Sequence, residues 1–312
     1  MRDISNFSLL DIKGDCFDML IASFTAWLKG EYRFLFTESL GFRFNKEGHT
    51  LGDKIIIAKG DIVDIAIRNG MIIKINKAST VSQEALLSMV DTYSPIILEI
   101  DGHDCPWRNT FQKIHRLHYI LLLKYDTHAN TFSCIDTFPT NNDLTISLDF
   151  MLKRAKRFIV LLTDDKKVIR LKHKDYFLTT IERYSNKDVI GSYFDHLNLF
   201  IESFGNTIDL QKETKGLDAI EMIHVPLIWK LKNYVWSFSQ YQYLLEYINE
   251  KDFGELKNIL QKIINCWEIV ISILAMKIIR KDTLVYTEKI QEYIKKAVKD
   301  EELFIERLST YF

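Results

Sequence analysis

The spacing of hydrophobic residues changes once along this chain of 312 residues, near residue 174. Before that point, short runs of β-branched and other apolar residues are separated by turn residues, which is typical of β-strands. After it, apolar residues recur three and four positions apart, which is typical of amphipathic helices. We therefore predict a mixed α+β domain over residues 1–174 and a helical domain or cap over residues 175–312.

Two of the strand-like runs predict a hairpin. They span 118–125 and 131–135, and the segment between them, DTHAN at 126–130, supplies turn residues. Antiparallel pairing of the two runs would bring the start of the first close to the end of the second. The other expected strands lie at 54–58, 71–75, 96–100, 157–162 and 168–171, and helices are expected at 10–30, 82–90, 188–204, 216–249, 252–281 and 284–310.

The composition excludes several classes of protein. The 41 Lys and Arg residues nearly balance the 42 Asp and Glu residues, so the net charge of −1 gives no overall basic field for binding nucleic acid. Four cysteines are too few for a disulfide scaffold. No segment reaches the ~18 uncharged apolar residues of a membrane span, and the N-terminus shows no secretory signal. We expect a cytoplasmic protein with free thiols and no membrane segment.

Three residues form a candidate catalytic set: Cys16, His118 and Asp136. Cys16 lies near the start of the first expected helix, where unpaired backbone N–H groups favour the thiolate, the nucleophilic form of cysteine. His118 begins one strand of the predicted hairpin and Asp136 follows the other. We therefore expect an imidazole and a carboxylate at one edge of the sheet, where a packed helix would bring the thiol to them.

Such a set would act as a nucleophile, a base and an orienting carboxylate. The imidazole would remove the thiol proton and later protonate the leaving group, while the carboxylate fixes the tautomer and stabilises the imidazolium. From the residues alone, a structural role for each stays open, because buried cysteine is also a common small hydrophobic residue.

Four segments carry a resemblance to a known family. They are PIILEID at 95–101, CPW at 105–107, HRLHYILLLKYD at 115–126 and FSCID at 132–136. They resemble the N-terminal domain of the butirosin-biosynthesis acyltransferase family, which is similar to papain-like cysteine peptidases of the bacteriocin-processing type. The likeness covers about residues 8–165.

The resemblance implies a fold, a reaction and a set of partners. The fold is papain-like, with a central helix opened by the cysteine and an antiparallel sheet that carries the histidine and the carboxylate. The reaction is acyl transfer in antibiotic assembly, as in the amide-forming step of closthioamide assembly. An acyl or thioamidated peptidyl chain would move from a carrier-protein thioester, through an acyl-enzyme on Cys16, to a primary amine such as diaminopropane. No metal or other cofactor is implied, and a homo-oligomer stays open.

The sequence departs from the peptidase pattern around Cys16. Papain-like enzymes have a Gln a few residues before the cysteine as an oxyanion donor, whereas LDIK occupies 10–13 here. The Cys16 N–H would supply one donor, and the sequence identifies no second. Asp15 and Asp18 flank the thiol and should raise its pKa. Either could bind a cationic amine, with helix capping as the alternative role. Trp107 is a candidate substrate contact, with core packing as the alternative.

Other functions would use the same residues differently. The three candidate residues would also serve a cysteine peptidase or a thioesterase, and the missing Gln fits a catalytically silent binding protein with this fold. A zinc site is a further alternative, although no Cys-x-x-Cys pair supports it. Its candidate ligands are His103, Cys105, His115 and His118.

Two further segments each allow two interpretations. The basic stretch 153–157 would dock an acidic carrier protein or form a solvated helix face. The dense aromatic residues between 234 and 247 would line a lid over the acyl chain or fill the core of a helical bundle.

Overall fold

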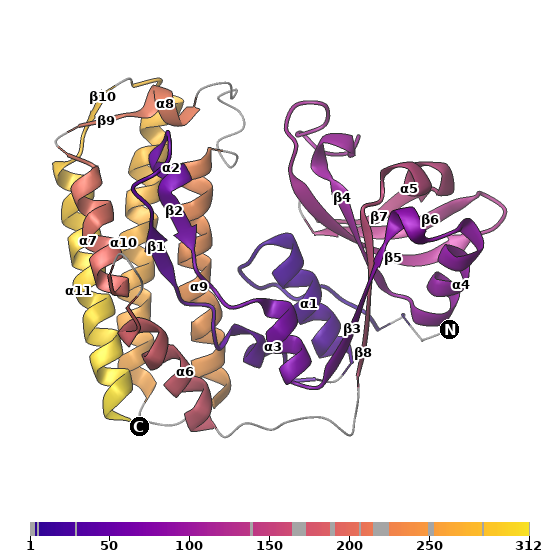
Figure 1. Cartoon of the computed structure of the whole chain (residues 1–312), viewed down its shortest axis with the longest axis horizontal. Coiled ribbons are helices and arrows are strands. Elements are labelled where there is room, and N and C mark those ends of the chain that lie inside the picture. Colours follow the sequence, from indigo (N-terminus) through magenta and orange to yellow (C-terminus); the bar gives the residue numbers. More distant parts are fainter. Residues whose placement is uncertain are drawn as a thin grey trace. The chain divides into compact units, whose positions relative to one another are not determined.

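The chain divides into two compact units in the computed structural model (Figure 1). The structure describes residues 4, 6–28, 30–137, 140–163, 173–187, 191–205, 207–214, 225–248, 253–282 and 284–311. One unit, called the sheet unit below, comprises Met1–Tyr32 and Ile62–Arg170. The other, called the helical unit, comprises Arg33–Asp61 and Leu171–Phe312.

This division differs from the predicted ranges at one segment near the N-terminus. Arg33–Asp61 belongs to the helical unit, because its strands β1 (Phe42–Phe44) and β2 (Ile55–Ile57) pack against helices α7 (Tyr193–Ser203) and α9 (Pro226–Ile248). The phenylalanines at both ends of β1 are part of the core of that unit. The change of hydrophobic period therefore does not mark the whole boundary between the units.

The sheet unit contains a sheet of six antiparallel strands, in the order β3-β8-β4-β5-β6-β7. They are β3 (Met71–Lys77), β4 (Ile96–Asp101), β5 (Leu117–Asp126), β6 (Thr131–Thr137), β7 (Thr140–Ser147) and β8 (Arg157–Thr163). The predicted α+β class and the predicted hairpin, which is β5 with β6, are confirmed. β7 is a polar strand that hydrophobic pattern does not predict, and the expected strand at 168–171 lies outside the described residues.

Helices pack on both faces of this sheet. Successive residues of a strand face opposite sides. The even-numbered core residues of β5 pack with α4 (Gln83–Tyr93) and α5 (Leu148–Arg154) on one side. On the other side, α1 (Cys16–Trp27) contacts β5, and its Phe17 ring lies 4.5 Å from the ring of Tyr119. The sheet is thus buried on both faces, with α1 beside the strand that carries the candidate base.

Amphipathic helices form most of the helical unit. The longer ones are α6 (His173–Ser185), α7, α9, α10 (Gly254–Ile279) and α11 (Glu288–Thr310). Tyr234, Phe238 and Tyr241 are buried in the common core, so these aromatic residues fill the bundle. A short antiparallel pair, β9 (Thr207–Asp209) with β10 (Leu284–Tyr286), corrects the expectation that this part of the chain contains helices alone.

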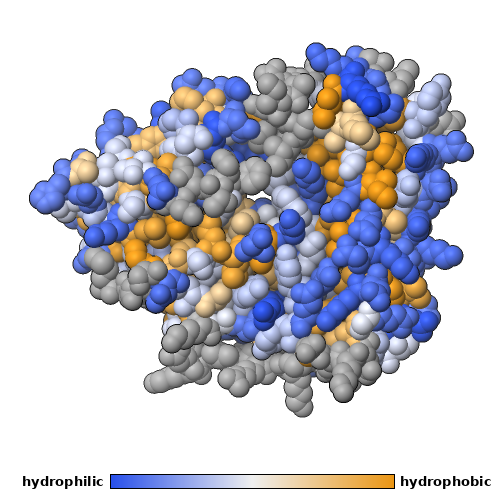
Figure 2. Space-filling view, turned by 180° about the vertical axis from the view of Figure 1, so that it is seen from behind, coloured by the Kyte–Doolittle hydropathy of each residue, from blue (hydrophilic) through white to orange (hydrophobic). Residues whose placement is uncertain are grey.

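Apolar surface remains exposed on both units. Figure 2 shows hydrophobic patches between stretches of hydrophilic surface on one face of the molecule. The exposed large hydrophobic residues include Ile269, Met276 and Ile279 of α10 and Ile72 and Ile75 of β3. The apolar stripe of α10 is therefore wider than its neighbouring helices cover. Among the described residues, no helix combines the length and apolar character needed to cross a membrane.

One buried carboxyl group joins α11 to three other helices of the helical unit. Glu301 of α11 accepts hydrogen bonds from Tyr193 Oη at 2.6 Å, Tyr234 Oη at 2.7 Å and Trp267 Nε1 at 2.9 Å. Burial raises the pKa of Glu301 to about 7, against the lowering effect of these three donors. The group therefore titrates near neutral pH in the folded protein.

Glu301→Gln should make the stability of the protein less dependent on pH. The folded-state pKa lies above the ordinary value of 4.5, so the folded unit keeps a proton that the unfolded chain loses. The free energy of unfolding should thus fall by about 1.4 kcal/mol per pH unit as the pH rises between these values. Thermal unfolding followed by circular dichroism from pH 5 to pH 7.5 measures this slope.

The exposed neighbour Glu302 provides the matched control. Glu302→Gln should keep the wild-type slope, whereas Glu301→Gln should flatten it. A slope that is unchanged in Glu301→Gln would show that this carboxyl is ionised in the folded protein at pH 5.

Candidate active site

The pairing of β5 with β6 brings two of the predicted residues together. Ile120 pairs with Asp136, and His118 lies two residues before Ile120 in β5, on the same side of the sheet. His118 Nε2 is 3.0 Å from Asp136 Oδ1 and 2.9 Å from Oδ2. The two side chains are 4% and 0% exposed. The predicted proximity of the imidazole and the carboxylate is confirmed, and both groups are shielded from solvent.

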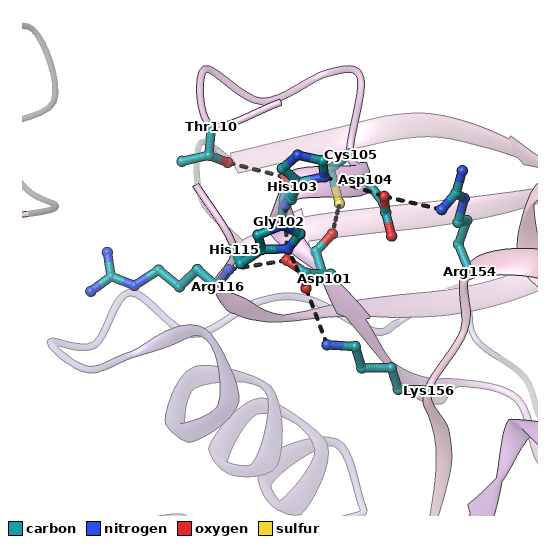
Figure 3. Close-up of polar contacts among 10 residues, drawn as sticks. All are labelled: Asp101, Gly102, His103, Asp104, Cys105, Thr110, His115, Arg116, Arg154 and Lys156. Atoms are coloured by element: carbon teal, nitrogen blue, oxygen red, sulfur yellow. Dashed lines mark hydrogen bonds and ion pairs between the residues drawn. The ribbon is translucent and has the colours of Figure 1, made fainter. Parts of the chain in front are cut away.

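A single carboxylate holds both ends of the loop between β4 and β5. Asp101, the last residue of β4, accepts hydrogen bonds from the backbone N–H groups of His103 and Arg116, each at 3.0 Å. Its Oδ2 atom lies 3.2 Å from both His115 Nδ1 and Lys156 Nζ (Figure 3). Burial raises the pKa of Asp101, but these hydrogen bonds outweigh it and hold the pKa well below its usual range. The Asp101 carboxylate is therefore ionised at neutral pH.

This loop brings Trp107 and Arg108 to the carboxylate of the pair. Trp107 Nε1 donates to Asp136 Oδ2 at 2.8 Å, and its ring packs against Phe150. The Arg108 side chain is 8% exposed, and its Nη1 atom lies 3.6 Å from Asp136 Oδ1. Trp107, the candidate substrate contact, is therefore hydrogen-bonded to the candidate catalytic carboxylate and helps to orient it.

Arg108 also contacts the imidazole. Its Nη1 atom lies 3.0 Å from His118 Nδ1 and 2.7 Å from Nε2. An ionised Asp136 only accepts hydrogen bonds, so we assign to His118 the tautomer with the proton on Nε2. Arg108 Nη1 is within 3.0 Å of both ring nitrogens, which places the guanidinium over the face of the imidazole. Its positive charge therefore disfavours protonation of His118.

Cys16 is the first residue of α1, which is shorter at both ends than the helix expected at 10–30. Asp15 precedes it as the N-cap, and its carboxylate accepts hydrogen bonds from the backbone N–H groups of Phe17 at 3.0 Å and Asp18 at 2.9 Å. The capping interaction explains why the helix begins here. Asp15 thus has the capping role that was the alternative to amine binding.

The Cys16 thiol shares its electrostatic surroundings with the His118–Asp136 pair. The backbone N–H of Tyr119, the residue after His118, lowers the pKa of the thiol, and the charges of Arg108 and Asp136 also act on it. The partners that the structure describes at the His118 ring are Arg108 and Asp136, and not Cys16. Direct thiol–imidazole contact would thus require a rearrangement of these side chains.

Cys16 is protonated at neutral pH. Burial and the charge of Asp15 raise the pKa of its thiol to about 12, against the lowering effects of the Tyr119 N–H and Arg108. The expectation that the helix start favours a thiolate is wrong here, because burial disfavours the charged sulfur and because Asp15 takes helix N–H groups and adds a negative charge. The expected effect of Asp15 on the thiol pKa is confirmed.

His118 is neutral at neutral pH. Burial lowers its pKa below the ordinary value of 6.5, and Arg108 lowers it further, while Asp136 raises it. A neutral imidazole is the form that accepts a proton. The site therefore combines a protonated thiol with an unprotonated base, and not a thiolate with an imidazolium.

The remaining candidate residues lie apart from this chemistry or have structural contacts. Asp18 is a buried residue of α1. The rings of His103 and His115 stack with centroids 4.0 Å apart, and the Cys105 thiol donates to the carbonyl oxygen of Asp101 at 3.4 Å. In the part of the chain that the structure describes, no three His, Cys, Asp or Glu side chains converge as metal ligands. The zinc interpretation therefore gains no support.

The basic stretch at 153–157 is locally neutralised. Its ion pairs are Lys153 with Asp149 at 2.8 Å, Arg154 with Asp104 at 3.3 Å, Lys156 with Asp101 at 3.2 Å and Arg157 with Glu99 at 3.0 Å. Each of the four cations faces a carboxylate, so the stretch does not present a patch of one charge for an acidic carrier protein.

Two arginines near the thiol are not predicted from the sequence. Arg108 contacts the pair directly, and Arg116 interacts electrostatically with Cys16 and Asp15. Both lie in the β4–β5 loop or at its end, inside or next to the segments that carry the family resemblance. The spacing of the two arginines in the sequence does not predict this, because the positions of their side chains depend on the folded path of the loop.

Comparison with models of protein families gives no match, and comparison with curated proteins gives none either. The interpretation of this site therefore depends on its geometry and on the chemistry of its side chains.

The titration of His118 should respond in opposite directions to two substitutions. Arg108→Met should raise the pKa of His118, because it removes a nearby positive charge. Asp136→Asn should lower it further, because it removes the carboxylate that favours the imidazolium. NMR titration of the His118 ring protons in the three proteins measures these shifts. An unchanged or lower pKa in Arg108→Met would contradict the described contact between the guanidinium and the imidazole.

Proposed function

We propose that this chain is an acyltransferase that forms amides through an acyl-enzyme on Cys16. The observation that carries the proposal is the buried His118–Asp136 pair, with contacts of 2.9 and 3.0 Å, where His118 lies on β5, the strand that α1 with Cys16 contacts. A thiol, an imidazole and a carboxylate in one site are the parts of a nucleophilic acyl-transfer set. The helix-borne cysteine beside an antiparallel sheet supports a papain-like fold for the sheet unit.

In the first half-reaction, Cys16 attacks the carbonyl carbon of a carrier-protein thioester. Because the thiol pKa is about 12, the thiolate is not formed in advance, and the neutral His118 takes the proton during the attack. The imidazolium then protonates the departing carrier thiol. Asp136 accepts from Nε2 throughout and stabilises the imidazolium.

In the second half-reaction, a primary amine such as diaminopropane attacks the acyl–Cys16 thioester. His118 takes a proton from the amine and returns it to the Cys16 sulfur, so the enzyme is restored and an amide is released. The donor in this proposal is an acyl or thioamidated peptidyl chain of antibiotic assembly, in line with the resemblance of 95–136. With water in place of the amine, the same residues would act as a thioesterase or a peptidase.

A cytoplasmic location suits this chemistry. All four cysteines are free thiols, and a catalytic thiol that must stay reduced is favoured by a reducing compartment. The partners in this proposal are a carrier protein, which brings the acyl chain, and a primary amine, which accepts it.

Cys16→Ala should abolish both the acyl adduct and the amide product. Intact-protein mass spectrometry after incubation with acyl-carrier thioesters detects the adduct, and the added amine should release it. Alanine is a good helix former, so the free energy of unfolding should change by less than about 1 kcal/mol.

The matched control is Cys266→Ala, which removes a buried thiol of the helical unit. It should keep both the adduct and amide formation. Amide formation by Cys16→Ala at the wild-type rate would disprove the nucleophile. Release of free acid alone at high amine concentration would establish a hydrolase instead.

Asp136→Asn should lower the rate of acylation by about 10²–10⁴ while leaving the affinity for the thioester almost unchanged. The amide is neutral, so it cannot stabilise the imidazolium that forms during the attack. Single-turnover acylation over a range of thioester concentrations separates the rate from the affinity. A loss confined to affinity would assign Asp136 to substrate binding and not to orientation of the base.

A further inference from the structure

The helical unit contains a cavity that the proposed acyl transfer does not use. Its volume is about 230 Å³, and residues from the end of α6, the start of α7 and the segment around β1 line it (Figure 1). A water molecule takes about 30 Å³ in the liquid, so the cavity has room for a small organic molecule. Its lining residues belong to the helical unit, so the inference below is independent of the function proposed for Cys16.

The charged side chains of the cavity wall are cations. Arg43 of β1, Arg183 of α6 and Lys187, which follows α6, line the cavity together with Asn186. No Asp or Glu is among the lining residues in the part of the chain that the structure describes. Guanidinium and ammonium groups only donate hydrogen bonds, so this wall favours an anionic ligand over a neutral or cationic one.

Backbone carbonyl groups hold Arg183 at the cavity wall. Its Nη1 atom donates to the carbonyl oxygen of Glu38 at 2.8 Å, and the carbonyl oxygens of Leu40 and Ala58 each lie 3.4 Å from it. These contacts fix the guanidinium between α6 and the segment that carries β1. A ligand would therefore meet a positive charge that does not have to be ordered on binding.

Two carboxylates near the cavity do not cancel its charge. Glu38 Oε2 lies 3.6 Å from Arg183 Nη2, and Asp195 Oδ2 accepts hydrogen bonds from the N–H and hydroxyl groups of Ser192 at 2.7 and 2.9 Å. Both carboxylates face donors of the protein and are not among the lining residues. Three cations against two carboxylates leave a net positive charge at the cavity.

Aromatic side chains form another part of the wall. Phe42, Tyr184 and Tyr193 line the cavity and are buried in the core of the helical unit. The rings of the two tyrosines lie 4.1 Å apart, and Tyr193 Oη donates to Glu301 in the core. This side of the wall is therefore held by the packing of the bundle, and it suits an apolar or aromatic group.

We propose that this cavity binds the phosphate monoester of a small organic molecule. The phosphate group would lie against Arg43, Arg183 and Lys187, and the organic group against Phe42 and the two tyrosines. A phosphate monoester carries a charge of about −1.5 to −2 at pH 7 and has three acceptor oxygens, so it can bind several cations at once. A carboxylate has one negative charge and two oxygens, and it would use this set of donors less fully.

The test measures the binding of three probes to the full-length protein by isothermal titration calorimetry. The probes are phenyl phosphate, benzoate and phenol, which share a ring and differ in charge. Lys187→Gln removes one cation, and Ala58→Leu fills the cavity without a change of charge. The matched control is Lys212→Gln, which changes an exposed lysine of the same unit outside the cavity.

Phenyl phosphate should bind to the wild type at least about 10-fold more tightly than benzoate, and phenol should not bind measurably. Lys187→Gln should weaken the binding of phenyl phosphate by about 10-fold, which is the effect of one hydrogen bond to a charged group. Ala58→Leu should abolish it, whereas Lys212→Gln should match the wild type. Circular dichroism shows whether each variant remains folded, and Lys187→Gln decides alone if Ala58→Leu does not.

Three results would overturn the proposal. The first is a lack of phenyl phosphate binding to the wild type at concentrations up to about 10 mM. The second is binding that the folded cavity variants do not weaken, which would place the anion elsewhere on the protein. The third is binding of benzoate or phenol as tight as that of phenyl phosphate, which would exclude a site built for a phosphate group.

Discussion

The buried hydrogen bond between His118 and Asp136 is the interaction on which the site depends. A fully buried carboxylate costs several kcal/mol unless charged or polar partners surround it. Asp136 has an imidazole, the Trp107 indole N–H and the Arg108 guanidinium around it. Loss of one of these partners would leave the buried negative charge of Asp136 poorly compensated. The loop that supplies two of them is therefore as necessary to the pair as the two strands that carry it.

Stability and reactivity compete at the start of α1. Asp15 stabilises the helix by accepting hydrogen bonds from its first N–H groups, and the same charge raises the pKa of the Cys16 thiol. A site built for a preformed thiolate would leave these N–H groups to the sulfur. Here the reactivity of the thiol has to come from a base that is neutral at the moment of attack, and burial of His118 provides such a base.

Each of the two units contains a buried carboxyl group that is surrounded by hydrogen-bond donors. In the helical unit, Glu301 is surrounded by two tyrosine hydroxyl groups and an indole N–H, and burial moves its pKa to about 7. In the sheet unit, Asp136 is compensated by an imidazole and a guanidinium instead. Because its donors are neutral, Glu301 has a pKa close to neutral pH. The neighbouring guanidinium, in contrast, favours the ionised form of Asp136, which is the form that can orient a histidine.

The sequence by itself determined what local periodicity encodes: the α+β class, the β5–β6 hairpin, the presence of a helix that carries Cys16 and the proximity of His118 to Asp136. An antiparallel register fixes which side chains share a face, so that one pair follows directly from spacing. Only the tertiary structure decided that Arg33–Asp61 joins the helices and that Trp107 and Arg108 return to the carboxylate. The path of a loop depends on contacts with residues far away in the sequence, such as the bond from Asp101 to Lys156, and no local pattern records them.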